Sequence, residues 1–179
     1  SINADEVSVE VEEFKRALEL SKSQLHEIKQ GVTDKRLIDH LYIIDTHLMI
    51  LDDEMLVKDT IKLIEKEQIN AEAALHRTIT RFKNVFAGIE DEYLRERLGD
   101  IESIGERVLC NLSGETRQSL AEIDRKVVVI AHDLSPADTL QIDREKIIGF
   151  VTDVGGRTSH PSILARSLGV PAVVGLETA

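Results

Sequence analysis

The chain has 179 residues, and 33 Asp and Glu against 22 Lys and Arg give it a formal net charge of -11 at pH 7. With 42% hydrophobic residues it has the composition of a soluble globular protein, with material for one or two domains. The acidic balance argues against a nucleic-acid partner, and no run approaches the ~20 apolar residues of a membrane span. The single cysteine excludes an intramolecular disulfide framework and fits a reducing, cytoplasmic compartment.

Apolar residues recur at helical spacing through the first two thirds of the chain. The pattern predicts a long first helix that ends at Gly31, followed by a second apolar stripe over residues 37–51. A short third helix is predicted around residues 56–64, a fourth with Asn70 as its N-cap, and a last one over residues 94–112. Several amphipathic helices joined by short links indicate a helical bundle.

The pattern changes after Gly114. Residues 127–131, 147–151 and 172–174 are short apolar runs typical of buried strands, and residues 133–139 have turn and helix-cap chemistry. We therefore expect an α+β protein. A helical domain over residues 1–115 is followed by a partial α/β domain over residues 116–179.

A glycine-rich loop and a histidine lie between the last two predicted strands. The sequence reads Gly-Gly-Arg-Thr-Ser-His-Pro over residues 155–161. A helix is predicted to begin there, with Ser159 or His160 as N-cap and Pro161 at the first helical position, and to end at Gly169. The backbone amides of such a loop and of a helix N-terminus favour an anion. A neutral imidazole at this point is able to attack a phosphoryl group and hold it covalently.

The residues of this loop also have simpler interpretations. A lone histidine at the start of a helix is often only a polar cap, and Arg157 can be a solvated loop charge. In the functional interpretation His160 is the nucleophile and Arg157 clamps the phosphate. Gly155 and Gly156 then allow the backbone to approach the phosphate closely.

Residues 155–175 resemble the active-site signature of the phosphohistidine (swivelling) domains, with Gly-Gly, Thr-Ser-His and Ala-Arg-Ser-Leu-Gly-Val-Pro in order. The arginine before Thr-Ser-His resembles the Enzyme I family of the phosphoenolpyruvate:sugar phosphotransferase system. Pro161 is a mild departure that fits a helix start. The resemblance implies phosphorylation of His160 on Nε2. It also implies active-site support from Gly155, Gly156, Arg157, Thr158, Ser159 and Thr139.

Thr139 has two interpretations. It matches a family threonine after Asp-Leu-Thr/Ser-Pro and would accept the other imidazole N–H of His160, which sets the tautomer. Alternatively it caps a helix.

Two helical segments also resemble the Enzyme I family, in which a helical subdomain binds the small carrier HPr. They are His-Leu-Met-Ile-Leu-Asp-Asp-Glu over residues 47–54, and Asp-Glu-Tyr-Leu followed by Asp-x-x-x-Ile-Gly over residues 91–105. The resemblance implies a carrier-binding face with Met49, Ile50, Asp53, Leu94 and Arg97. The alternative is that the apolar members belong to the core. An acidic bundle suits a basic carrier by electrostatic complementarity.

As a whole the resemblance implies a phosphoenolpyruvate-protein phosphotransferase that carries the phosphoryl group on His160 and passes it to an HPr-like carrier. It implies that the chain is a fragment. The family's opening and closing strands and its C-terminal domain, which binds phosphoenolpyruvate and Mg²⁺ and makes the full-length protein a homodimer, are not in this sequence. No metal site and no cofactor are expected in this chain itself.

Three alternatives stay open at this point. The chain can belong to a nitrogen-type Enzyme I, or to a dihydroxyacetone-kinase phosphodonor subunit with the same chemistry. It can also be a noncatalytic helical interaction module.

Overall fold

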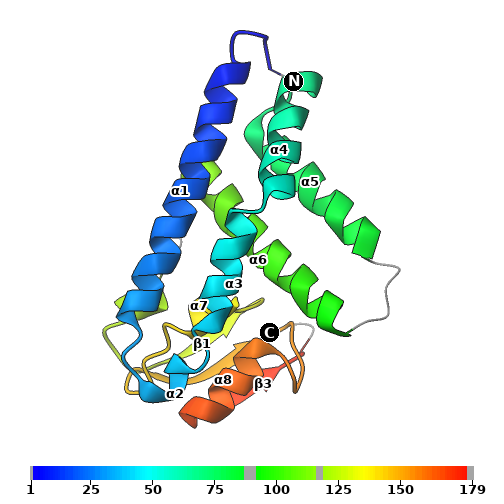
Figure 1. Cartoon of the computed structure of the whole chain (residues 1–179). Helices are drawn as coiled ribbons and strands as arrows, with labels where there is room; N and C mark the ends of the chain where they lie inside the picture. The colour runs from blue at the N-terminus through cyan, green and yellow to red at the C-terminus, as the bar shows by residue number, and fades with distance from the viewer. Residues whose placement is uncertain (1, 87–91, 116–118, 177–179) are drawn as a thin grey trace. The chain divides into compact units, whose positions relative to one another are not determined.

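A computed structural model describes residues 2–86, 92–115 and 119–176 (Figure 1), with side chains for all of these except 86 and 92–97. The predicted α+β class is confirmed. The chain forms two compact units, Ser1–Leu25 with Asp45–Arg117, and His26–Ile44 with Gln118–Ala179. We call them the helical unit and the sheet unit. The predicted division placed residues 26–44 in the helical domain, whereas the structure groups them with the sheet unit.

The helical unit is built from five helices that carry most of the predicted apolar stripes. They are α1 (Val7–Gly31) and α3 (Tyr42–Leu51), each of which contributes part of its length, with α4 (Glu54–Glu67), α5 (Ala71–Phe86) and α6 (Glu92–Ser113). α5 packs against both α4 and α6. Asn70 caps α5 as predicted, because its Oδ1 accepts a hydrogen bond from the Ala73 amide at 3.1 Å. Fully buried apolar side chains fill the core: Phe14, Leu25, Leu51, Ile64, Leu75 and Val108.

The second predicted stripe, over residues 37–51, is not one helix. It is divided into α2 (Lys35–Ile38) and α3, with residues 39–41 between them. The backbone there makes i→i+3 bonds, from the amide of His40 to the carbonyl of Leu37 and from that of Leu41 to Ile38. A 3₁₀-like turn keeps side chains on nearly the same side as an α-helix does, so the apolar spacing continues where the α-helix stops.

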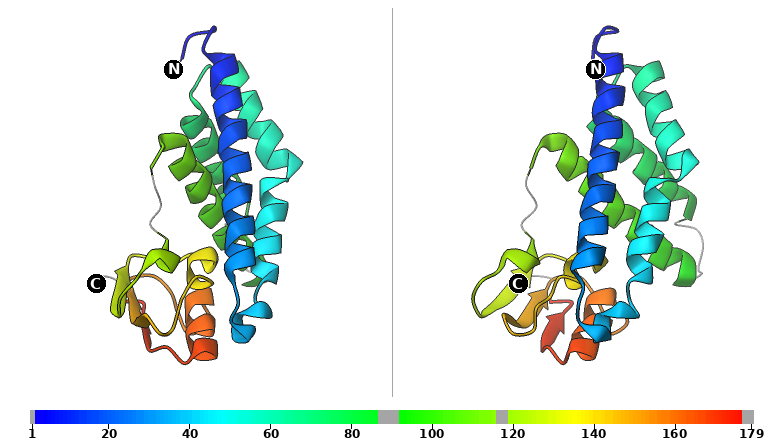
Figure 2. Two further views of the ribbon diagram at one scale, coloured as in Figure 1. Left: turned by 90° about the vertical axis from the view of Figure 1, so that its left-hand side faces the viewer. Right: turned by 60° about the vertical axis from the view of Figure 1, so that its left-hand side comes forward.

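The sheet unit contains a parallel sheet of order β1-β2-β3, formed by β1 (Val127–Ala131), β2 (Ile147–Thr152) and β3 (Ala172–Val174). The short helices η1 (Leu120–Glu122) and α7 (Pro136–Thr139) and the longer α8 (His160–Leu168) complete it. α8 packs against α2, α7 and β3 (Figure 2). Phe150 and Thr152 of β2 are buried, whereas Val128, Ile130 and Val173 leave at least half of their surface exposed. One sheet face is therefore packed and the other carries exposed apolar side chains.

No helix within the described ranges combines the length and the apolar character that a membrane crossing requires.

Candidate active site and carrier face

The glycine-rich loop joins β2 to α8. Ser159 is the N-cap residue of α8, but its hydroxyl does not cap the helix. It donates instead to the Gly156 carbonyl at 2.9 Å and lies 3.2 Å from the Ser162 hydroxyl oxygen. His160 is the first residue of α8, so Pro161 is the second. Of the two predicted N-caps the structure selects Ser159, and the proline still occupies a position where no amide hydrogen is needed.

The two loop glycines differ in what they require. Gly155 has φ +119°, and a Cβ there would lie 3.2 Å from the Ser159 hydroxyl oxygen and 3.4 Å from the Val174 Cβ. Gly156 has no atom within 4 Å of the place of a Cβ. Gly155 also contacts the end of β3, because a Cβ on Gly175 would lie 3.0 Å from the Gly155 carbonyl oxygen. The conformation therefore demands glycine at 155 and only permits it at 156.

Backbone amides around His160 are available to a ligand. Among the described residues no hydrogen-bond acceptor faces the amides of residues 155–158, of His160 or of Ser162. The first amide of α8 that bonds to the backbone is that of Ile163, to the Ser159 carbonyl. His160 is half-buried, while Arg157 and Thr158 are exposed. Unpaired amides, a helix N-terminus and an exposed arginine thus lie together in the segment 155–162 that holds His160, and this combination favours a bound anion.

Arg166 holds the loop from the other end of α8. Its Nη2 donates to the Arg157 carbonyl oxygen at 2.9 Å. Arg166 is not among the site residues predicted from the sequence. The signal that pointed to it was the Ala-Arg pair inside the signature, nine positions after Arg157.

Thr139 lies at the end of α7, is fully buried, and donates its hydroxyl to the Pro136 carbonyl oxygen at 2.8 Å. No hydrogen bond joins Thr139 and His160 in the described part of the chain. The hydroxyl hydrogen of Thr139 is thus already donated within α7. The same helix has a capping box between Ser135 and Asp138. The Thr139 oxygen keeps lone pairs that can accept a hydrogen bond.

A histidine and an aspartate that follow two neighbouring strands form a polar pair near the loop, and this pair is not predicted from the sequence. His132 follows β1 and Asp153 follows β2, and His132 Nδ1 lies 3.0 Å from Asp153 Oδ2. Adjacent parallel strands end at the same sheet edge, which brings these two side chains together.

The carrier face predicted on the helical unit coincides in part with an apolar cavity of about 250 Å³. Ile50 and Asp53 line it, together with Met55, Leu56, Arg81, Phe82, Val85 and Ile101. Met49 does not line the cavity, but its side chain is 70% exposed, and Met55 and Val85 are also largely exposed. Met49 and Met55 are therefore surface residues, not core residues. Leu94 and Arg97 lie in the early part of α6, and their side chains are outside the described residues.

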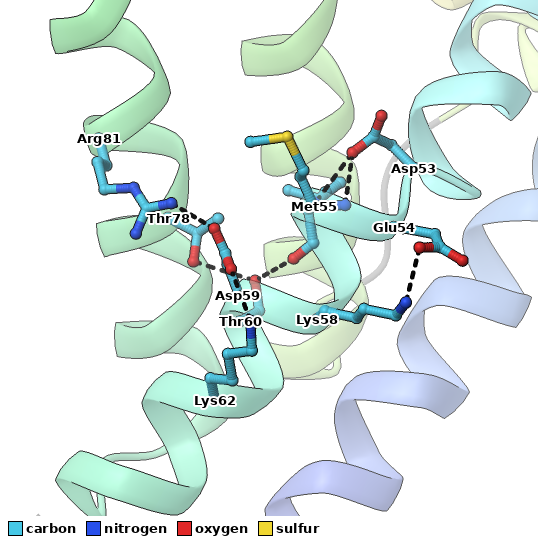
Figure 3. Close-up of polar contacts among 10 residues, drawn as sticks. Asp53, Glu54, Met55, Lys58, Asp59, Thr60, Lys62, Thr78 and Arg81 are labelled. Atoms are coloured by element: carbon cyan, nitrogen blue, oxygen red, sulfur yellow. Dashed lines mark hydrogen bonds and ion pairs between the residues drawn. The ribbon is translucent and has the colours of Figure 1, made fainter.

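Asp53 has a structural task that the sequence reasoning did not foresee. It is the N-cap of α4, and its Oδ1 accepts hydrogen bonds from the amides of Met55 at 2.8 Å and Leu56 at 3.1 Å (Figure 3). Figure 3 also shows an ion pair between Asp59 of α4 and Arg81 of α5. The cap and this ion pair fix the helices that form the cavity.

Within the described ranges, no three His, Cys, Asp or Glu side chains are grouped so that they could hold a metal ion.

Known proteins match almost the whole length of the chain. The PEP-utilising enzyme N-terminal family matches residues 1–97, and the PEP-utilising enzyme mobile domain matches residues 123–179. A phosphoenolpyruvate-protein phosphotransferase of Listeria innocua is 44% identical over 170 residues, which are 95% of this chain and 30% of the relative. The chain thus spans about a third of the length of the curated relatives that it matches.

Solved structures agree. An NMR solution structure of Enzyme I superimposes with a TM-score of 0.83 and 38% identity, covering 99% of this chain and 72% of that protein. The N-terminal domain of the nitrogen Enzyme I has a TM-score of 0.66 at 24% identity over 95% of this chain and 69% of that one, and so supports the fold alone. The chain therefore belongs to the PEP-utilising enzymes and corresponds to the N-terminal region of Enzyme I, the phosphoenolpyruvate-protein phosphotransferase.

Proposed function

We propose that His160 carries a phosphoryl group as a phosphohistidine and passes it to an HPr-like carrier protein that docks on the helical unit. The observation that supports this most directly is the set of unpaired backbone amides in residues 155–162, the segment that holds the half-buried His160 and the exposed Arg157. Phosphoryl transfer needs positioning and charge stabilisation more than covalent chemistry from the protein, and backbone amides on a fixed loop supply both.

In the proposed reaction the Nε2 lone pair of neutral His160 attacks phosphorus. A new N–P bond forms, and the bond from phosphorus to the donor breaks, so that the donor leaves with its electron pair. When phosphoenolpyruvate is the donor, the broken bond is O–P and the leaving group is the pyruvate enolate. Transfer to the carrier repeats the step: the carrier's nucleophile attacks and His160 leaves as a neutral imidazole.

The chain's own groups have distinct tasks in this step. The amides of Gly155 and Gly156 and the first amides of α8 bind the phosphoryl oxygens, together with the amide and hydroxyl of Thr158. Arg157 neutralises the growing charge. Arg166 fixes the Arg157 backbone, and Ser159 keeps the turn closed through Gly156. Thr139 accepts the second imidazole N–H of His160 once the side chain turns toward α7, which leaves Nε2 free for attack.

The rest of the reaction cycle is assigned to the parts of the relatives that this chain does not span. We propose that phosphoenolpyruvate and Mg²⁺ bind there, that the full-length protein is a homodimer and that it works in the cytoplasm in sugar transport. The 38% identity to the Enzyme I structure over 99% of this chain favours the sugar branch. The intact loop around His160 argues against a noncatalytic module.

The test uses a phosphorylated HPr-like carrier as donor. The wild-type chain should acquire an acid-labile, base-stable phosphate. His160→Ala should lose it entirely, with unchanged helical content by circular dichroism. His132→Ala is the matched control, because His132 is another histidine of the sheet unit and its side chain is exposed. This variant should acquire the same phosphate as the wild type. Phosphate that persists on His160→Ala would refute the assignment. With phosphoenolpyruvate and Mg²⁺ alone, neither chain should be labelled.

Carrier docking has its own test. Asp53→Asn removes a charge but keeps an oxygen for the α4 cap, so it should weaken binding and reduce its salt dependence without a loss of stability. Met49→Ala should raise the dissociation rate with little change in salt dependence. Glu65→Gln and Val9→Ala are matched controls, since both residues are exposed on the helical unit and lie outside the cavity lining.

Titration of labelled carrier at low and high salt, alongside a thermal melt, separates these effects. If Asp53→Asn and Met49→Ala bind as tightly as the two controls, this face is not the docking surface.

A further inference from the structure

Three arginines from different elements of the sheet unit line one cavity of about 500 Å³. Arg36 belongs to α2, Arg144 lies in the turn before β2, and Arg166 is in the last turn of α8. The packing of α2 against α8 brings the first and the last of these together (Figures 1 and 2). Among the described residues that line the cavity, none is Asp or Glu.

The positive charges of this cavity are poorly balanced by the protein. Arg36 is paired with Asp34, to which its Nε donates at 2.9 Å and its Nη2 makes a second bond. Hydrogen bonds from the Arg36 side chain and backbone, with Arg144 nearby, lower the pKa of Asp34 to about 2, so this carboxylate is ionised throughout the neutral range. Asp34 therefore offsets one of the three charges.

Neither of the other two guanidinium groups forms an ion pair with a carboxylate within the described residues, although Arg144 lies near enough to Asp34 to help lower its pKa. Arg166 donates one N–H to the Arg157 carbonyl oxygen, and Arg144 makes no hydrogen bond or ion pair there. Arg36 still directs Nη1 toward the Leu168 carbonyl oxygen, at 3.4 Å, which is a long contact. Most N–H donors of the three forks thus remain available at one cavity, in a protein whose formal net charge is -11.

We propose that this cavity binds a small molecule that carries at least two phosphate groups. A guanidinium fork binds phosphate in a bidentate manner, and a phosphoryl group offers three acceptor oxygens to forks that approach from different elements. The excess of two positive charges calls for a ligand with more than one anionic centre. The volume lies within the ~300–1,000 Å³ typical of small-molecule sites.

This site is distinct from the loop that holds His160. Residues 155–160 do not line the cavity, which is bounded by Ser167, Leu168 and Gly169 at the opposite end of α8. A ligand there would approach the C-terminal end of the helix, where the helix dipole opposes the binding of an anion. The arginines must therefore supply the binding free energy, and the proposal depends on them.

The experiment is a titration of the ¹⁵N-labelled chain with inorganic pyrophosphate at constant ionic strength, followed by amide chemical shifts. We expect saturable shifts at Ser167 and Gly169. Arg144→Gln should weaken binding by at least about tenfold, which corresponds to the loss of a charge-assisted hydrogen bond. Arg125→Gln is the matched control, because Arg125 is exposed on the same unit outside the cavity, and it should bind as the wild type does.

The variants avoid Arg166, since its contact with the Arg157 carbonyl oxygen would confuse loss of a ligand contact with a change in the loop. His160→Ala should retain the pyrophosphate response, which separates this site from the proposed phosphorylation site. Shifts at Gly155 and Gly156 without shifts at Ser167 and Gly169 would overturn the proposal. So would an equal response in Arg144→Gln and the wild type, or binding of citrate as tight as that of pyrophosphate.

Discussion

The helical unit and the sheet unit differ in what their candidate sites are made of. The helical unit carries 22 Asp and Glu against 13 Lys and Arg, whereas the sheet unit carries 11 against 9. The apolar cavity of the helical unit is lined by side chains from α3, α4, α5 and α6. In the sheet unit the candidate site consists mostly of backbone amides on one loop. Side chains on helices suit the recognition of a partner, and fixed amides suit the binding of a phosphoryl group.

The two units also differ in how many glycines adopt a positive φ. Gly155, Gly169 and Gly175 of the sheet unit have positive φ, whereas Gly114 is the only such glycine in the described part of the helical unit. Gly155 and Gly175 lie directly against each other at the loop. Changes in backbone freedom should therefore impair the sheet unit, and changes in buried side-chain partners should impair the helical unit. Three predictions test this comparison.

The largest effect is expected for Gly155→Ala. Its φ of +119° is unfavourable for any residue with a Cβ, and the new Cβ would lie 3.2 Å from the Ser159 hydroxyl oxygen. We expect about 1–3 kcal/mol of destabilisation and at least about a tenfold drop in the rate of His160 phosphorylation, because the loop amides move. Gly156→Ala is the control, since its Cβ meets no atom within 4 Å. A phosphotransfer assay measures the phosphorylation rate, and chemical denaturation measures the free energy of unfolding. Equal rates and equal stabilities of the two variants would contradict the assigned loop geometry.

A smaller effect, on stability alone, is expected for Asp100→Ala in the helical unit. His47 of α3 is 1% exposed, and its Nε2 lies 3.2 Å from Asp100 Oδ1 of α6. Its Nδ1 is buried without a partner in the described residues. Removal of the carboxylate leaves the whole imidazole unpaired, which should lower the free energy of unfolding by about 1–3 kcal/mol. Asp100→Asn keeps an oxygen at this place and should cost less. Urea unfolding of the wild type, Asp100→Ala and Asp100→Asn measures these differences. If Asp100→Ala is as stable as the wild type, the pair does not contribute to stability.

The smallest effect concerns Asp34 beside the arginine cavity. Since its pKa is lowered from 3.8 to about 2 in the folded chain, the stability linked to its ionisation is present above pH 3.8 and is lost as the pH falls through about 2. Arg36→Gln removes the first cause of this shift and should raise the pKa of Asp34 toward 3.8. A ¹³C NMR titration of the side-chain carboxyl measures it. An unmoved midpoint in Arg36→Gln would show that Arg36 does not hold this carboxylate.

Much of the fold follows from local pattern. The long helix that ends at Gly31, the Asn70 cap and the strand over residues 127–131 were predicted and are confirmed, because each depends on apolar spacing or on a residue with a specific backbone preference. The break between α2 and α3 was missed, since a 3₁₀-like turn leaves the spacing of apolar residues almost unchanged. The grouping of residues 26–44 with the sheet unit also escaped prediction, because it depends on contacts between segments far apart in the sequence.

The candidate site divides in the same way. The loop and the start of α8 near His160 could be predicted from local residues, because glycine and proline at fixed spacing act on the backbone next to them. The family could be predicted from the long signature over residues 155–175. Three contacts could be read only from the folded chain. Arg166 donates to the Arg157 carbonyl oxygen, Thr139 donates its hydroxyl to the Pro136 carbonyl oxygen inside α7, and Asp53 caps α4. The tertiary structure also brought Arg36, Arg144 and Arg166 to one cavity. Contacts between residues distant in the chain depend on how helices and strands pack, which local spacing does not specify.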